Sequence, residues 1–526
     1  MNKKVALIQP QINIGKSLGI AKAPESIMAL AGQLEKLGYQ VRMFHASASP
    51  ELMESLEKFS PDYVGISTMT PNYPEGRKIA ETLKKYNPEL PIILGGWHAS
   101  GCVQAHLLGQ ESESLAELLN KKSPFDFVIA GEGEKALPEL LCHLEYDVPV
   151  EAKNGVSFFR RGKMHVSPLA ERIQHLVDIA TPSWKGLNVD DYRDKRSNEL
   201  DLSVHFNRAC RFKCSFCATA VVYGQGVKTT PALQAVAYIR FLVETFHPQV
   251  ITFTDEDFFA NQRWVNEIVD HLEQAHLHEK YGVVFDTFAS INDLHYLRRT
   301  GRGDLLDHMK EVGFRSFTIG IESFNPAILL KFNKEQMIIP TMGDETRRLY
   351  PKSDLDEKKS ALLRTHLLRA QQAIEFAQEH DIMVVGDYIL GNLGETEAEV
   401  REGFELFKNI KGLLTAYIPV FTPFPGTAIW AEAYDSGLLA RTAKGGIDWE
   451  QFNASAGALN LGYDIETLRN QLELEFYTSS RYTEDMLNAI ENNPDAKKLF
   501  IGRFNYLDRV FPKDERIQRQ LALLDC

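Results

Sequence analysis

Short apolar runs alternate with amphipathic segments over the first 150 residues. A strand at 4–10, a helix at 24–38 and a second strand at 40–46 are predicted from this pattern. Three further apolar runs end in glycines or hydroxyl residues: 62–70, 91–100 and 126–141. Parallel strands that end in small residues at one edge leave a crevice where a ligand can approach the backbone. The pattern therefore predicts a Rossmann-like α/β domain over residues 1–150, with or without a bound ligand.

The same alternation continues along the middle of the chain, which is typical of repeated βα units. The helix over 231–246, for example, follows Thr230 and has a proline at its first position. A partial (β/α) barrel of the TIM type is predicted over 199–430, with its chemistry at the C-terminal ends of the strands. A linker over 151–198 precedes it. Helical spacing of apolar residues predicts a mostly helical extension over 431–526, in which the aromatic residues serve packing.

Composition restricts the setting of these domains. The chain is 44% hydrophobic and 25% charged, and no apolar run approaches the roughly 18 residues of a membrane span. Its N-terminus fits a first strand better than a signal peptide, so a cytoplasmic protein is expected. A formal charge of −13 argues against a nucleic-acid partner, because such proteins normally carry a basic surface.

Three of the six cysteines fall within eight residues, at Cys210, Cys214 and Cys217. The other three are isolated and are interpreted as small buried side chains: Cys102, Cys142 and Cys526. A zinc site would need a fourth ligand, for which His205 is available. A 4Fe-4S cluster held by three thiolates would leave one iron open to a substrate or cofactor. Both kinds of site are compatible with the cysteine spacing.

The residues around the cysteines resemble the radical S-adenosylmethionine (SAM) superfamily, whose signature is C-x3-C-x2-C with an aromatic residue before the last cysteine, here Phe216. Downstream motifs agree in order: 250-VITFTDEDFFANQ-262, 317-FTIGIESF-324, 384-VVGDYILGNLGETEAEV-400 and 419-PVFTPFPGT-427. The resemblance implies that the three cysteines bind a 4Fe-4S cluster whose open iron holds SAM, and that a donor such as flavodoxin or ferredoxin supplies the electron that splits it. It places these further residues near SAM: Asp255, Glu322, Ser323, Ile389 and Gly391. Thr396 is predicted to cap a helix.

The strand ends of the first domain, GISTMT, GGWHAS and GEGE, resemble the cobalamin-binding domain of the class B members of this superfamily. That likeness implies that the following residues surround cobalamin: Ser67, Thr68, Gly95, Gly96, Gly131 and Gly133. His98 follows the glycine pair, where a structural role is as well supported as contact with the corrin. The usual D-x-H-x-x-G loop is missing, since no histidine occurs between Val5 and Phe44. We therefore expect no axial histidine from that loop.

The two-domain resemblance implies a C-methyltransferase that acts on an unactivated carbon through a 5′-deoxyadenosyl radical and methylcobalamin. A cobalamin-linked oxidative cyclase or rearrangement enzyme stays open, as does a radical SAM enzyme whose first domain binds no corrin. A methylthiotransferase would need three N-terminal cysteines, and only two occur there. The substrate is a small molecule, lipid or peptide that the sequence does not identify.

Some positions depart from the family pattern. Asn392 and Leu393 stand where Leu-Pro is usual, Ala209 replaces the glycine before the first cysteine, and Phe324 follows G-I-E-S, where it could narrow the pocket. The segment from Phe332 to about 363 is longer than usual, and its many charges favour a solvated surface insertion.

Overall fold

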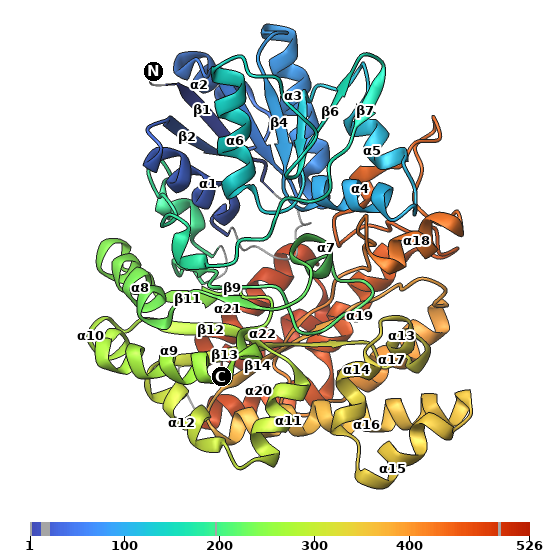
Figure 1. Ribbon diagram of the computed structural model, residues 1–526. Coiled ribbons are helices and arrows are strands. Elements are labelled where there is room, and N and C mark those ends of the chain that lie inside the picture. Colours follow the sequence, from blue (N-terminus) through green and yellow to red (C-terminus); the bar gives the residue numbers. More distant parts are fainter. Residues whose placement is uncertain (1–2, 12–21, 195–196, 493–495, 526) are drawn as a thin grey trace.

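Two sheets of mainly parallel strands organise the chain, one above the other in the view of Figure 1. The computed structural model describes residues 3–11, 22–194, 197–492 and 496–525. The first sheet consists of β1 (Lys4–Gln9), β2 (Gln40–His45), β3 (Tyr63–Ser67), β4 (Ile92–Gly95), β5 (Phe127–Ile129), β6 (Val156–Arg160) and β7 (Lys163–His165). Its helices are α1 (Glu25–Lys36), α2 (Pro50–Phe59), α3 (Tyr73–Tyr86), α4 (Trp97–Leu107), α5 (Glu113–Leu118) and α6 (Gly133–Glu145).

The strand order of the first sheet is β2-β1-β3-β4-β5-β6-β7. The first five strands run parallel, and β6 and β7 are added antiparallel. Alternate residues of β1 face opposite sides: Val5 and Leu7 belong to one core with residues of α1 and α6, whereas Ala6 and Ile8 belong to the other with residues of α2 and α3. The α/β fold is as expected, and the segment expected as a linker supplies two of its strands.

The second sheet has the order β15-β14-β13-β12-β11-β8 and is parallel throughout. Its strands are β8 (Asp201–Val204), β11 (Val250–Phe253), β12 (Val284–Ala289), β13 (Phe314–Glu322), β14 (Met383–Tyr388) and β15 (Thr415–Tyr417). A short antiparallel pair lies beside it: β9 (Asn207–Arg208) and β10 (Lys228–Thr229). Among the described residues no ladder joins β15 to β8, so the barrel is open, as the prediction of a partial barrel requires.

Helices surround this sheet and alternate with its strands (Figure 1). They are α7 (Thr219–Tyr223), α8 (Ala232–Phe246), α9 (Gln262–Ala275), α10 (Leu277–Tyr281), α11 (Ile291–Arg299), α12 (Gly303–Glu311), α13 (Pro326–Lys331), α14 (Glu335–Ile338), α15 (Asp344–Leu349), α16 (Leu355–Glu379) and α17 (Glu397–Lys408). The predicted cap of α17 is confirmed: the hydroxyl of Thr396 accepts a hydrogen bond from the backbone N–H of Glu399.

The last hundred residues are mostly helical, as predicted: α18 (Ala428–Asp435), α19 (Ile465–Thr478), α20 (Ser480–Asn492), α21 (Ala496–Val510) and α22 (Glu515–Asp525). The hydroxyl of Tyr477 in α19 hydrogen-bonds both the N–H and the carbonyl of Ala416 on edge strand β15. The Arg469 guanidinium donates to the Ile418 carbonyl at 2.9 Å. These helices therefore satisfy backbone groups that an edge strand leaves unpaired. In the described ranges no helix is both long and apolar enough to cross a bilayer.

Candidate functional site

The three clustered cysteines lie in the loop between β9 and α7, at the C-terminal side of β8. Their thiols are free and partly exposed. Ala209, directly before the first of them, has φ +78° and is fully buried. This left-handed conformation is one that glycine adopts without strain, which gives the physical reason why glycine is usual at this position. The backbone N–H of Cys217 donates to the Cys214 carbonyl at 3.2 Å, so the loop turns tightly between the last two thiols.

Within the part of the chain that the structure describes, no three His, Cys, Asp or Glu side chains converge as ligands of a single metal ion do. A cubane does not need such convergence, because each thiolate binds a different iron atom. His205, the available fourth zinc ligand, has its Nε2 atom 2.9 Å from the Glu256 carboxylate instead. His205 is therefore paired with a carboxylate, and the assignment of the cysteines to a cluster stays a prediction.

Two acidic residues after β11 contact the cysteine loop and the chain that leads into it. Asp255, 1% exposed, accepts hydrogen bonds through Oδ1 from the backbone N–H groups of Phe206 and Asn207. Burial raises the pKa of Asp255 to about 7. Asp257 accepts from the guanidinium of Arg211, and its Oδ2 atom is 3.6 Å from the Cys210 thiol. Asp255, predicted to lie near SAM, is therefore placed under the chain that leads into the cysteine loop.

Glu322 ends β13 in a left-handed conformation, with φ +67°. Its carboxylate forms an ion pair with Lys334 at 3.0 Å, and both side chains are nearly excluded from solvent, with exposures of 11% and 7%. Burial lowers the pKa of Lys334, but Glu322 and the Cys214 thiol outweigh it, so the net shift is upward. The Lys334 ammonium also lies 5.7 Å from the centroid of the Phe216 ring. Glu322, Phe216 and the cysteine loop thus lie around one buried ammonium group.

Lys334 belongs to the segment that was interpreted as a solvated insertion. That interpretation holds for α15, which has no buried residue, but not for the segment's beginning. Lys334 is 5% exposed, and Phe332 is fully buried with its ring 4.4 Å from that of Phe216. The charge pattern of the segment concealed a buried cation, because its partner lies outside the segment, twelve residues earlier at the end of β13.

The other three residues predicted to lie near SAM make contacts within the protein. The Ser323 hydroxyl accepts from the backbone N–H of Asn325, two residues on. The N–H of Ile389 donates to the Glu322 carbonyl at 2.8 Å. Gly391 has φ +71°, and a Cβ there would come within 2.8 Å of Ile465 of α19. Phe324 is buried in the barrel wall with its N–H on the Tyr388 hydroxyl, so it does not narrow the cavity described next.

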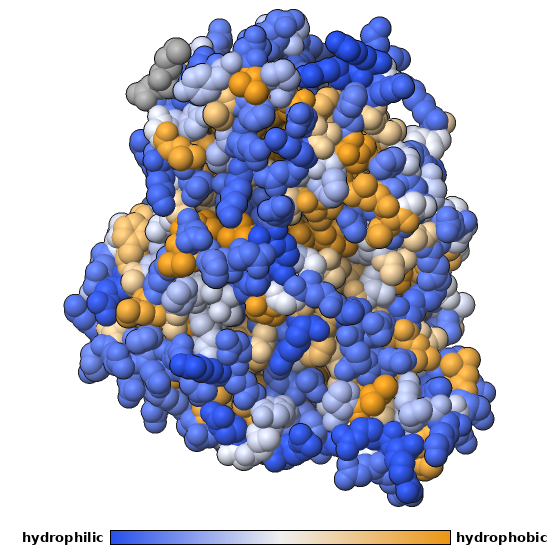
Figure 2. Space-filling view, viewed as in Figure 1, coloured by the Kyte–Doolittle hydropathy of each residue, from blue (hydrophilic) through white to orange (hydrophobic). Residues whose placement is uncertain are grey.

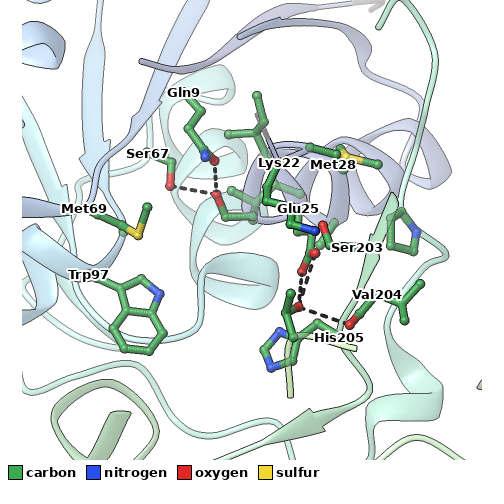
Figure 3. A pocket seen from close by; sticks show the side chains of 18 of the residues that line it. Gln9, Lys22, Glu25, Met28, Ser67, Met69, Trp97, Ser203, Val204 and His205 are labelled. Atoms are coloured by element: carbon green, nitrogen blue, oxygen red, sulfur yellow. Dashed lines mark hydrogen bonds between the residues drawn. The ribbon is translucent and has the colours of Figure 1, made fainter. Parts of the chain in front are cut away.

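A cavity of about 1810 Å³ lies between the two sheets. On the face seen in Figure 2, hydrophobic side chains gather where the upper domain meets the barrel, within a mostly hydrophilic surface. Figure 3 shows side chains of both domains pointing into this space, among them Ser67, Met69 and Trp97 from the first domain and Ser203 and His205 from the barrel. Asp387 of β14, which sequence reasoning missed, also lines it. Burial raises the pKa of Asp387 well above the ordinary value, and its Oδ1 atom has no hydrogen-bond partner in the part of the chain that the structure describes.

The strand ends predicted to hold cobalamin form the upper wall of the cavity: Ser67, Thr68, Gly95, Gly96, Gly131 and Gly133 all line it. Gly96 and Gly131 both have φ +92°. A Cβ on Gly96 would lie 2.5 Å from the Thr68 carbonyl oxygen, and one on Gly131 would lie 2.9 Å from the Ala170 nitrogen. The Thr68 hydroxyl is buried and has no partner in the described structure. Bare backbone at these two glycines thus faces this space.

His98 does not line the cavity. It is completely buried, and its ring stacks on Tyr73 at 4.0 Å and meets Trp449 edge-on. Burial lowers its pKa to about 3, so it is neutral. Of the two roles considered for His98, the structural one is therefore favoured. The cavity-lining histidine of the first domain is His45 at the end of β2, one residue beyond the range in which the missing loop histidine was sought. Residues 12–21 of that range, like Cys526, lie outside the described residues.

The two domains are joined through the GEGE motif by a buried network. Arg208, two residues before the first clustered cysteine, donates to Glu132 at 2.7 Å and to Glu134 at 2.5 Å. Burial raises the pKa of Glu134, but Arg208 outweighs it, so the net shift is downward and the carboxylate stays ionised. The glutamates of the motif, unassigned from sequence, thereby tie the β5 strand end to the cysteine loop.

Two protein families match the chain. The model of the B12 binding domain matches residues 23–141, and that of the radical SAM superfamily matches residues 204–407. These ranges cover the upper wall of the cavity and its barrel floor, respectively.

Among curated proteins, an uncharacterized methyltransferase of Pyrococcus horikoshii is 22% identical over 90% of this chain and 92% of its own length. An anaerobic magnesium-protoporphyrin IX monomethyl ester cyclase of Rubrivivax gelatinosus is 22% identical over 86% of this chain and 72% of its own length. Among solved structures, the radical SAM methyltransferase TsrM of Kitasatospora setae, with cobalamin and a [4Fe-4S] cluster bound, superposes with a TM-score of 0.58. It shares 17% identity over 84% of this chain and 80% of its own.

Proposed function

Because the chain belongs to the cobalamin-dependent radical SAM enzymes, we propose that it is a C-methyltransferase acting on an unactivated carbon of a small-molecule, lipid or peptide substrate. The observation that carries this proposal is the single cavity, which the cobalamin-type strand ends line from above and the barrel strand ends line from below. When bound, the cluster and SAM supply a radical that removes a hydrogen atom from the substrate, and cobalamin supplies the methyl group that replaces it.

The cysteine loop fits a 4Fe-4S cluster with three protein ligands. Cys210, Cys214 and Cys217 are the ligands, thiolates being what such clusters require. Three backbone and side-chain contacts fix the loop: Asp255 holds its entry, the N–H of Ser215 donates to the Phe332 carbonyl at 3.1 Å, and the Ser215 hydroxyl donates to the Lys331 carbonyl. The loop can therefore keep its thiols oriented toward one cluster.

SAM would be held beside this loop. We assign Phe216, Glu322, Ser323, Ile389 and Gly391 to its surroundings, by resemblance. Lys334 is added, because its ammonium contacts both Glu322 and the ring of Phe216. The Glu322–Lys334 pair gives one carboxylate and one ammonium, which suit the amino and carboxylate groups of a bound amino acid.

The upper wall fits cobalamin. The glycines at 95, 96, 131 and 133 leave the backbone uncovered, and side chains at Gly96 or Gly131 would collide with neighbouring main chain. The hydroxyls of Ser67 and Thr68 complete this cradle. Since His98 is buried elsewhere, the cobalt is proposed to lack that histidine as an axial ligand. Spectroscopy of the cobalt(II) state should then show no nitrogen splitting, and a nitrogen signal that vanishes in His98→Ala would refute this detail.

The rest of the cavity protects the reaction. Its largely apolar lining, including Met69, Trp97 and Phe288, excludes water from a radical intermediate. We expect the electron to come from a flavodoxin- or ferredoxin-type donor, and the reaction to take place in the cytoplasm, where clustered thiols stay reduced.

Methyl-labelled SAM tests the reaction class. The reconstituted enzyme, a strong reductant and a small-molecule extract of cells that lack the gene should give a labelled product. S-adenosylhomocysteine and 5′-deoxyadenosine should form in about equal amounts, since each turnover uses one SAM for each role. The second candidate is a cyclase or rearrangement enzyme, favoured by the likeness to the Rubrivivax cyclase. It would give 5′-deoxyadenosine with little S-adenosylhomocysteine and an unlabelled product.

A further inference from the structure

We propose that the barrel floor of the cavity, formed by Ser203, His205 and Glu256 together with Glu25 of α1, binds a protonated amine of the substrate. The proposal rests on the proposed function, because it names the chemical class of the molecule that this site takes. None of the four residues belongs to the cysteine loop or to the glycine cradle.

The four side chains face one space. Ser203 lies on β8 and His205 directly after it, and Thr254 and Glu256 follow the neighbouring strand β11, so these residues come together at the C-terminal edge of the sheet. Ser203, His205, Thr254 and Glu256 all line the cavity, as does Glu25. The Thr254 hydroxyl donates to the Glu25 carboxylate, and Figure 3 shows His205 below Glu25.

Hydrogen-bond acceptors outnumber donors at this floor. His205 uses Nε2 on one oxygen of Glu256, at 2.9 Å, which leaves the other carboxylate oxygen without a bond in the described residues. Glu25 receives only the Thr254 hydroxyl, at 3.2 and 3.3 Å. The Ser203 hydroxyl is buried, with 3% of the residue exposed, and has no hydrogen-bond partner among the described residues. A buried polar group without a partner needs an explanation, and a ligand in the cavity supplies one.

The charge at the floor is also unbalanced. Burial lowers the pKa of His205, but Glu256 and other nearby acids outweigh it and raise that pKa to about 9, so the imidazolium neutralises one carboxylate. Lys22 is bound to Asp201 at 2.5 Å. Glu25 has no ion-pair partner among the described residues. One negative charge therefore remains beside a partly desolvated cavity.

A protonated amine matches both features. It carries three N–H donors, no acceptor and one positive charge. A carboxylate or phosphate would be repelled by Glu25 and Glu256, and a hydroxyl would leave the extra charge uncompensated. The aromatic ring of Trp97, which also lines the cavity, provides a face that favours a cation.

Three isosteric probes test this inference: pentylammonium, pentanol and pentanoate. Their binding to the full-length protein, reconstituted with iron, sulfide and hydroxocobalamin, is measured by ligand-observed NMR. We expect pentylammonium to bind at least about 10-fold more tightly than either of the others, the effect of one charge-assisted hydrogen bond. Equal binding of all three probes, or preference for pentanoate, would overturn the proposal, and this result needs no variant.

Glu25→Gln and Glu256→Gln should each reduce pentylammonium binding by about 10-fold and leave pentanol unchanged. Glu51→Gln is the matched control, since Glu51 occupies the first turn of α2 as Glu25 does in α1 but lies on the surface. Unchanged ammonium binding in both cavity variants would also refute the inference. Because no turnover is measured, a failure here leaves the methyl-label test unaffected, and an unlabelled product would not alter the binding result.

Discussion

Replacing Lys334 by methionine should destabilise the barrel strongly. The change keeps the apolar stem of the side chain beside Phe216 but removes the ammonium, which leaves the Glu322 carboxylate buried without a counter-ion. At 3.0 Å and an effective dielectric constant of about 20, the lost attraction is on the order of 5 kcal/mol. Breaking a buried pair by removing one partner typically costs about 3–5 kcal/mol. We therefore expect Lys334→Met to lower the free energy of unfolding by about that amount.

Urea unfolding of the cluster-free protein provides the measurement, with hydrogen exchange of the β13 peptide to localise the loss. The double variant Lys334→Met/Glu322→Gln should recover much of the stability, because no charge is then left unpaired. Arg263→Met is the control: it breaks an ion pair with Glu267 whose side chains are 89% and 43% exposed, so it should cost about 1 kcal/mol or less. A loss below about 1 kcal/mol in Lys334→Met, or a double variant no more stable than the single one, would refute the reasoning.

Three further outcomes are expected. Ala209→Gly should relieve about 1–2 kcal/mol of left-handed strain at an entropic cost of about 0.5–1 kcal/mol, so the melting temperature should not fall. The control Ala235→Gly, inside α8, should lower the melting temperature. A lower melting temperature in Ala209→Gly would contradict this reasoning. The pKa of His98 is lowered to about 3 in the folded state. As the pH falls below about 6.5, the imidazole therefore takes up a proton in the unfolded state but stays neutral in the folded state. Acidification from pH 7 to 5 should therefore lower the free energy of unfolding by about 2 kcal/mol more in the natural protein than in His98→Phe. Urea midpoints of the two proteins that fall in parallel with pH would contradict this expectation. Cys214→Ala should lose SAM cleavage and the brown colour of the reconstituted protein; full cleavage activity would rule out the assigned cluster.

The elements of both sheets could be predicted because their signals are local. Each strand is a short apolar run, and the spacing of Thr396 and Glu399 indicates the cap of α17. The cysteine loop was equally readable, since its three thiols lie close together in sequence. Strands β6 and β7 were missed because the pairing of β6 with β5 spans about thirty residues, and β7 joins the sheet through a short hairpin with β6. Their sequence carries charges and a tight turn, which also suit a linker.

Long-range pairing likewise explains the gaps in the predicted site. Lys334 sits in a charged stretch, and only the fold shows that Glu322 buries it. Glu132 and Glu134 have no visible purpose until Arg208, more than seventy residues away, is placed beside them. For His98 the sequence left a structural role and contact with the corrin both open, and the fold favours the structural role because the residue is completely buried. Spacing predicts groups that are close in sequence, whereas charge partners across the fold remain hidden.

The return of the chain to its first domain bears on how the protein is synthesised. Trp449 donates its indole N–H to Glu117 at 2.8 Å and stacks on Trp430, and both rings share a core with Tyr73. One face of the first domain is therefore finished only after about 300 more residues have left the ribosome, roughly 15–60 s later at ordinary elongation rates. During that interval the apolar face that receives these tryptophans is uncovered. A nascent chain halted near residue 200 should thus bind chaperones or a hydrophobic dye at this face, and Trp449→Ala should prolong that binding in the finished protein.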